Sequence, residues 1–195
     1  YVSRVQYPGY YLRDAIHILR AYDLYGYPDL SSENIRFIQG GGLNPDPNDN
    51  LDLSKYGDML WNYAEHYLFT GDKKFAREII PEAKAIITWC EKVRAKDELG
   101  IIPKCSLEDN ELVTNGHRPG DNFMMLAGLR AAKRMAEELQ DNELLKQADS
   151  EIENFHPQIV KAIGRVMDEA GYVPATFDKG TGRGNDGWGQ DWGNL

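Results

Sequence analysis

The chain has 195 residues, of which 42% are hydrophobic and 27% charged, a composition typical of a globular domain with its own core. Its net charge of −9 argues against nucleic acid as a partner, because phosphate backbones are bound by lysine and arginine clusters, and the sequence has none. The sequence has neither an apolar run long enough to cross a bilayer nor an initial signal-peptide pattern, so no membrane partner is expected.

The first two predicted helices form a hairpin. Apolar residues at helical spacing predict a helix over Tyr10–Tyr25, which Gly26 would end as a C-cap. A shorter helix is predicted from a serine cap at Ser31 or Ser32 to about residue 39. A loop rich in glycine, asparagine, aspartate and proline follows, up to Leu53.

The next hairpin is predicted from helices over Lys55–Phe69 and Lys73–Lys96, which the turn 70–72 separates. Pro81 lies inside the second of these helices, where it predicts a break or a new first turn. The long loop Glu98–Gly120 follows. Long connections without secondary structure are uncommon in compact domains and are usually functional.

The last hairpin is predicted from helices over Asn122–Leu139 and from Asn142 to about Glu169. Pro157 predicts a kink or a restart in the second of them. The segment Gly171–Gly193 is rich in glycine, aspartate and tryptophan and is predicted to be another long loop.

The odd-numbered and even-numbered predicted helices differ in character. The first, third and fifth are apolar around much of their circumference, whereas the others are charged and amphipathic. This pattern predicts an all-α fold in which three stacked hairpins form an inner layer of buried helices and an outer layer. Only the connections from outer to inner helices are long, so antiparallel hairpins would place every long loop at one end.

An acidic residue recurs where the apolar helices begin, at Asp14, Asp58 and Asp121, and again at Asp191. If the hairpins stack, the loops that enter the inner helices bring these carboxylates to one polar cleft. Acid chemistry in that cleft is the expectation.

Three groups of residues form a pattern known from one superfamily. They are Tyr11-Leu12-Arg13-Asp14-Ala15, then Phe69-Thr70-Gly71-Asp72 with Phe75, Ile80-Pro81 and Trp89, and finally Asp121-Asn122 with Ala127-Gly128-Leu129-Arg130-Ala131-Ala132. In these motifs the chain resembles the six-hairpin glycosidases, α/α toroids that include glucoamylases, trehalases, processing α-glucosidases and α-rhamnosidases. The resemblance covers three of six hairpins. It therefore implies that residues 1–195 are one partial catalytic toroid domain, truncated at both ends.

The resemblance implies an inverting glycoside hydrolase with a carbohydrate substrate. In such enzymes a carboxylic acid protonates the leaving oxygen and a carboxylate about 6.5–9.5 Å away activates water. In related toroids the acid comes from the loop before the third inner helix, and the base comes from a loop late in the barrel, beyond Leu195 here. We predict Asp121 as the acid, since burial beside Phe123 and Met124 would favour its neutral form. Glu111 and Glu108 are the alternatives in the same loop.

Each candidate also has a simpler explanation. Asp121 could be an N-cap, and Asp14 an acidic residue favoured in a first helical turn. Arg13 and Asp14 could instead grip sugar hydroxyls, as an Arg-Asp pair in this position does in glucoamylase-like relatives. His117 and Arg118 could orient the substrate, although a histidine in a polar loop is more often solvated.

The tryptophans near the end of the chain are candidates for substrate binding. Trp188 and Trp192 could stack on sugar rings beside Asp191, with flanking glycines that admit a close approach. The same indoles could equally be packing groups that cap the fold.

No metal or cofactor is predicted. The segment 46–52 resembles the start of a calcium loop, but Leu51 stands where that loop needs glycine and Gly57 where it needs glutamate, so a turn is expected. Cys90 and Cys105 form no metal-ligand pattern and are expected to be two thiols.

Two other functional classes stay open. A sugar epimerase or uronate-acting enzyme could use the same toroid, but it needs a histidine or tyrosine base, and His117 is the one well-placed histidine. A non-catalytic helical-repeat scaffold is the other alternative. Its repeats would keep a fixed period, whereas Asp14 to Asp58 spans 44 residues and Asp58 to Asp121 spans 63.

Overall fold

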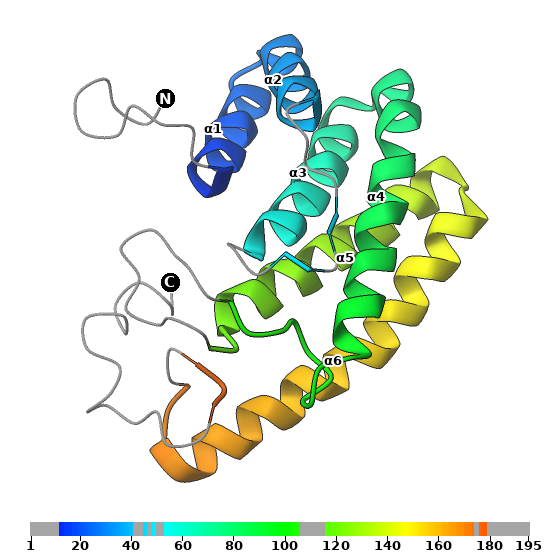
Figure 1. The fold of residues 1–195 in the computed structure, drawn as a ribbon. Helices are drawn as coiled ribbons and strands as arrows, with labels where there is room; N and C mark the ends of the chain where they lie inside the picture. The colour runs from blue at the N-terminus through cyan, green and yellow to red at the C-terminus, as the bar shows by residue number, and fades with distance from the viewer. Residues whose placement is uncertain are drawn as a thin grey trace, which may run out of the picture.

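The computed structural model describes residues 12–40, 45–46, 48–49, 53–105, 116–173 and 176–178 (Figure 1). These residues form six α-helices: α1 (Leu12–Leu24), α2 (Pro28–Gly40), α3 (Ser54–Thr70), α4 (Lys73–Arg94), α5 (Pro119–Leu139) and α6 (Asn142–Ala170). Apart from an isolated bridge between Cys105 and Gly116, the described residues contain no β-structure. The prediction of an all-α chain is confirmed.

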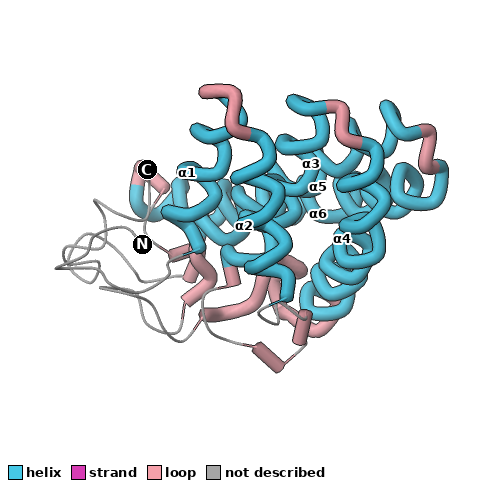
Figure 2. The backbone as a smooth tube through the Cα atoms, turned by 90° about the horizontal axis from the view of Figure 1, so that it is seen from above, coloured by secondary structure: helices cyan, strands magenta, loops and turns pink. Residues whose placement is uncertain are grey.

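The six helices form three consecutive hairpins, α1–α2, α3–α4 and α5–α6. α3 lies at the centre and packs against both α1 and α5, while α4 contacts α6 on the other side. The short turns at 25–27, 71–72 and 140–141 all lie at one end, and the long connections lie at the opposite end (Figure 2). The predicted segregation of short and long connections is therefore confirmed.

α3 and α5 approach each other closely at two glycines. A Cβ on Gly57 would lie 2.5 Å from the backbone nitrogen of Met125, and one on Gly128 would lie 2.7 Å from the carbonyl oxygen of Gly57. Any side chain at either position would force the two helices apart. These glycines thus allow the first halves of α3 and α5 to pack backbone against backbone.

Burial is greatest in α3, where 11 of 17 residues are buried. In α1 only 4 of 13 residues are buried, and Ile18 and Leu24 are exposed. α1 is therefore less enclosed than the prediction of a buried inner helix requires, because among the described elements it packs mainly against α2 and α3.

Polar pairs connect the charged helices α2, α4 and α6. Arg36 of α2 binds Glu78 of α4 at 2.9 Å, and Lys84 of α4 binds Glu143 of α6 at 2.7 Å. Their charged faces agree with an outer layer. None of the described helices has a stretch long and apolar enough to span a membrane.

Two predicted boundaries are wrong. α2 begins at Pro28, whose fixed φ suits a first helical turn, and not at a serine cap; Ser31 and Ser32 lie inside it, and the Ser32 hydroxyl donates to the carbonyl of Asp29. The predicted break or new first turn at Pro81 and the predicted restart at Pro157 are also absent, since α4 and α6 continue through them. A kink at Pro157, the other alternative, stays a prediction.

Candidate functional site

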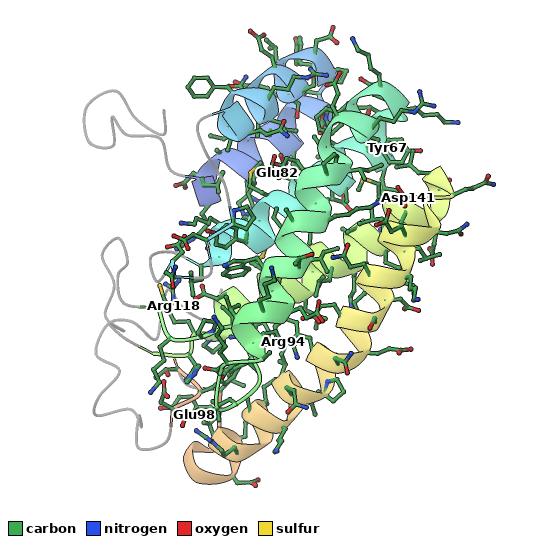
Figure 3. The ribbon with its side chains drawn as sticks, turned by 45° about the vertical axis from the view of Figure 1, so that its right-hand side comes forward. Tyr67, Glu82, Arg94, Glu98, Arg118 and Asp141 are labelled. Carbon is green, nitrogen blue, oxygen red and sulfur yellow. The ribbon has the colours of Figure 1, made fainter. Side chains whose placement is uncertain are left out.

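The candidate site lies at the end where α1, α3 and α5 begin. Arg118 and Glu98 lie at this end, whereas Tyr67 and Asp141 lie at the other (Figure 3). The long connections bring the segments 95–105, 116–118 and 176–178 together here. The fold thus concentrates charged loop residues at one end of the helices.

The recurrent acidic residues occupy equivalent places in the three hairpins. Asp14, Asp58 and Asp121 lie in the first two turns of α1, α3 and α5, respectively. Asp14 and its neighbour Arg13 are exposed, whereas Asp58 and Asp121 are buried. Only the α1 pair is therefore as open to solvent as a direct sugar contact requires.

Asp121 forms a two-point ion pair with Arg118. The guanidinium donates from Nη2 to Oδ1 at 2.6 Å and from Nε to Oδ2 at 3.2 Å, and Asp121 is 2% exposed. Such a fork stabilises the charged carboxylate. Of the two expected apolar neighbours, Phe123 is exposed and Met124 is partly buried, while the cationic Arg118 pairs directly with Asp121.

The alternative assignment of Asp121 as an N-cap is wrong in position. α5 begins at Pro119, its N-cap is Arg118, and Asp121 is the third residue of the helix. A carboxylate there still interacts favourably with the helix dipole. Asp121 consequently has a structural explanation in its ion pair and a functional one in its place at the site.

Asn122 connects two loops and is a site residue that the sequence pattern did not indicate. Its Oδ1 accepts from the backbone of Ile102 at 3.0 Å, and its Nδ2 donates to the carbonyl of Arg118 at 2.8 Å. The side chain is fully buried. It fixes the 95–105 segment to the start of α5.

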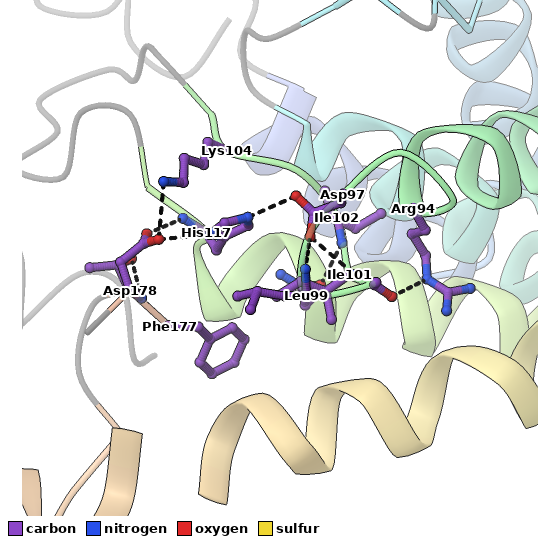
Figure 4. Close-up of polar contacts among 12 residues, drawn as sticks. Arg94, Asp97, Leu99, Ile101, Ile102, Lys104, His117, Phe177 and Asp178 are labelled. Atoms are coloured by element: carbon purple, nitrogen blue, oxygen red, sulfur yellow. Dashed lines mark hydrogen bonds and ion pairs between the residues drawn. The ribbon is translucent and has the colours of Figure 1, made fainter. Parts of the chain in front are cut away.

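His117 lies buried between two carboxylates (Figure 4). Its Nε2 is 2.9 Å from Asp97 and its Nδ1 is 2.9 Å from Asp178. Burial alone would lower the pKa of His117, but hydrogen bonds and charges from Asp178 and Asp97 raise that pKa to about 9. The expectation of a solvated loop histidine is wrong, and at neutral pH the ring is a buried imidazolium.

The pKa values of the two carboxylates, Asp97 and Asp178, are shifted in the opposite direction to that of His117. Burial would raise the pKa of Asp97 and of Asp178, but hydrogen bonds from His117 lower both below the usual value. Asp178 also accepts from the Thr176 hydroxyl at 2.6 Å and lies 3.3 Å from the Lys104 ammonium. Neither aspartate was a candidate from the sequence, because they lie 20 and 61 residues from the histidine.

Glu98, His117 and Asp178 each place one donor atom within 4.8 Å of the other two, a spacing that could hold a metal ion. However, both His117 nitrogens face carboxylates as hydrogen-bond donors, and the Lys104 ammonium lies beside Asp178. The His117 nitrogens thus carry protons that bind Asp97 and Asp178, and they have no lone pair left for a metal ion. We assign no metal to this cluster.

The bridge between Cys105 and Gly116 holds the two ends of the 106–115 segment side by side, directly next to His117. The candidates Glu108 and Glu111 belong to that segment and lie outside the described residues, as do Trp188, Asp191 and Trp192.

The described part of the 45–53 connection forms a turn attached to the core. The backbone of Asn48 donates to the Asp46 carboxylate at 2.9 Å, and Tyr56 donates to Asp49 at 2.8 Å. Trp89 donates to the carbonyl of Asp46 at 2.7 Å. These contacts agree with the predicted turn. Cys90 and Cys105 are two buried thiols, as predicted.

A groove of 1110 Å³ lies elsewhere, between α4 and α6. It is lined mainly by charged and amide side chains, and the buried pair Arg94–Glu151 lies in its wall. Of the segments that form the candidate site, the groove borders only the 95–100 part of the 95–105 segment, which includes Asp97 and Glu98. We therefore place the candidate site at the helix starts, where the long loops meet, and not in this groove.

Comparisons with protein-family models, with curated proteins and with solved structures found no match to this chain.

Proposed function

We propose that this chain forms about half of an α/α toroid and that the protein is an inverting glycoside hydrolase. The observation that carries the proposal is the common orientation of the three hairpins, which puts every long connection and the beginnings of α1, α3 and α5 at one end. In closed α/α barrels this is the end where a substrate cleft is built. The resemblance to six-hairpin glycosidases in the motifs at 11–15, 69–89 and 121–132 supports the same assignment.

The charges at this end agree with a carbohydrate substrate. Exposed Arg13 and Asp14 offer a fork of donors and two acceptor oxygens, the groups that bind sugar hydroxyls. Partly buried Arg118 and buried Asp121 add an ion pair at the start of α5, at the same end of the helices.

The Arg118–Asp121 ion pair bears on the choice between Asp121 and Glu111 as the general acid. A general acid must hold a proton before the bond breaks, whereas Arg118 stabilises Asp121 in its charged form. We therefore propose Glu111 as the first candidate for the acid, with Asp121 as the second. The Cys105–Gly116 bridge supports this choice, because it fixes the two described residues that flank the 106–115 segment, and Gly116 lies three residues before α5 begins.

Hydrolysis of a panel of aryl α- and β-glycosides tests the proposal, measured on the complete toroid of which this chain is the proposed half. For any glycoside that is cleaved, Glu111→Gln should slow cleavage of phenyl glycosides by about 10²–10⁴-fold and spare dinitrophenyl glycosides, whose leaving groups need no proton. Asp121→Asn should slow both alike if it only shapes the cleft. The control is Asp29→Asn, an exposed aspartate in α2 that follows a short turn.

The outcomes separate the candidates. Leaving-group dependence in Asp121→Asn, and not in Glu111→Gln, would transfer the acid role to Asp121. Absence of cleavage across the panel would contradict the hydrolase.

The alternatives have less support. A sugar epimerase needs a histidine or tyrosine base that reaches substrate. Both nitrogens of His117 are engaged and its ring is buried, and Tyr56, near the start of α3, is buried and donates to Asp49. His66 pairs with Asp23 near the opposite end of α3. A repeat scaffold does not account for the charged residues buried where the long loops meet.

A further inference from the structure

His117 is the residue through which three separate segments of the long-loop end are held together. Its ring contacts Asp97 of the 95–105 segment and Asp178 of the 176–178 segment. Its backbone N–H donates to Asp178 at 2.9 Å, and its carbonyl accepts from Phe177 at 2.8 Å. We name His117, Asp97 and Asp178 the histidine clamp.

Imidazolium suits this position better than neutral histidine. A neutral ring has one N–H and would turn a lone pair toward one of the two carboxylates, whereas the charged ring donates to both. The other charged groups near the ring are Glu98, whose carboxylate lies within 4.8 Å, and Lys104, which pairs with Asp178. Two charge-assisted hydrogen bonds thus connect loops that are far apart in the sequence.

The clamp continues directly into the candidate site. Gly116, directly before His117, is bridged to Cys105. Arg118, directly after His117, is both the N-cap of α5 and the partner of Asp121. Asn122 then binds the backbone of Ile102. The Arg118–Asp121 pair is therefore flanked by connections to the 95–105 segment. Gly116 and His117 make such connections before the pair, and Asn122 makes one after it.

We propose that His117 is a positioning residue, which holds the 95–105 and 176–178 segments against the start of α5 and thereby sets the place of Arg118 and Asp121. That these two residues belong to an active site rests on the proposed function. The clamp itself does not.

Local hydrogen exchange in the full chain tests the inference without a substrate. The variants are His117→Gln, which can donate to one carboxylate only, and the milder Asp178→Asn, which keeps the side-chain shape. The control is His156→Gln, because His156 is exposed on α6. Amides of 97–105, 116–118 and 176–178 should exchange at least tenfold faster in both clamp variants, while the centre of α3 stays as protected as in the wild type.

Unchanged exchange in these segments would overturn the inference, as would equal acceleration in every helix, which reports only a less stable fold.

For any glycoside that is cleaved, the pH profile adds a second readout. The alkaline limb near pH 9 should move to lower pH in Asp97→Asn, which removes one of the two charges that hold the proton. A limb that stays in place would overturn the positioning role. Faster local exchange without any cleavage would sustain the clamp and refute the hydrolase.

Discussion

Two groups of buried charges in the described residues are matched by opposite charges from other segments. His117 faces Asp97 and Asp178, and Arg94 of α4 pairs with Glu151 of α6. Removing one partner of a buried pair leaves an uncompensated charge, which costs far more than the pair contributes net. Single substitutions at these positions should therefore have large effects on stability.

The histidine clamp should make stability depend on pH. The folded pKa of His117 is about 9 against 6.5 for the free side chain, so its contribution is complete below pH 6.5 and is lost as the pH rises through 9. The same hydrogen bonds lower the pKa values of Asp97 and Asp178. Their contribution to stability is therefore lost when these carboxylates are protonated, as the pH falls below about 4.

Urea unfolding at pH 6, 8 and 10 measures this effect. The rise in pKa corresponds to roughly 3 kcal/mol, so the wild type should exceed His117→Gln by about that much at pH 6 and by much less at pH 10. His156→Gln should follow the wild type throughout. A difference between wild type and His117→Gln that is as large at pH 10 as at pH 6 would refute the charged clamp.

The Arg94–Glu151 pair permits a double-mutant cycle. Arg94→Met and Glu151→Leu should each lower the free energy of unfolding by about 3–5 kcal/mol, because each leaves a buried charge alone. The double variant should lose less than the sum, since it leaves no charge unpaired. Additive losses would show that the two side chains act independently.

At the scale of the elements, the contact between α3 and α5 depends on glycine. Gly57 and Gly128 let two backbones meet where a Cβ would lie at 2.5–2.7 Å from backbone atoms. The sequence motifs include both residues, but no local pattern indicates that they face each other across 71 positions. Pairing of distant elements is a tertiary property that helical periodicity does not encode.

Alanine at Gly128 tests this contact. Gly128→Ala should destabilise the fold by about 1–3 kcal/mol, because the added methyl group meets the carbonyl of Gly57. Gly164→Ala in α6 is the matched control: nothing lies within 4 Å of its Cβ, so it should stabilise by about 0.5–1 kcal/mol. Thermal unfolding of both variants measures the two changes in stability relative to the wild type. Equal shifts of the same sign would exclude a close helix contact.

Helix boundaries show where local rules fail. Pro81 and Pro157 each remove a backbone hydrogen bond, which predicts an interruption. Both prolines, and the residues four positions before them (Arg77 and Glu153), lie on exposed helix faces, so water can bind the carbonyls that lose their partners. The sequence shows that a proline is present but not which face it occupies.

For the whole molecule, the sequence was sufficient for the helices, their hairpins and the end at which long loops gather. It also indicated Arg13, Asp14, His117, Arg118 and Asp121 as residues of that end. It did not indicate the partners of His117 and Arg94, because ion pairs across 20 to 61 residues leave no periodic signal.

One measurement directly tests the proposal that the protein is an inverting glycoside hydrolase. Proton NMR of the sugar released from the aryl glycoside panel by the complete toroid, of which this chain is the proposed half, reports hydrolysis and its stereochemistry together. The account predicts that the first product has the anomeric configuration opposite to that of the substrate. A first product with the configuration of the substrate, or no released sugar, would contradict an inverting glycoside hydrolase.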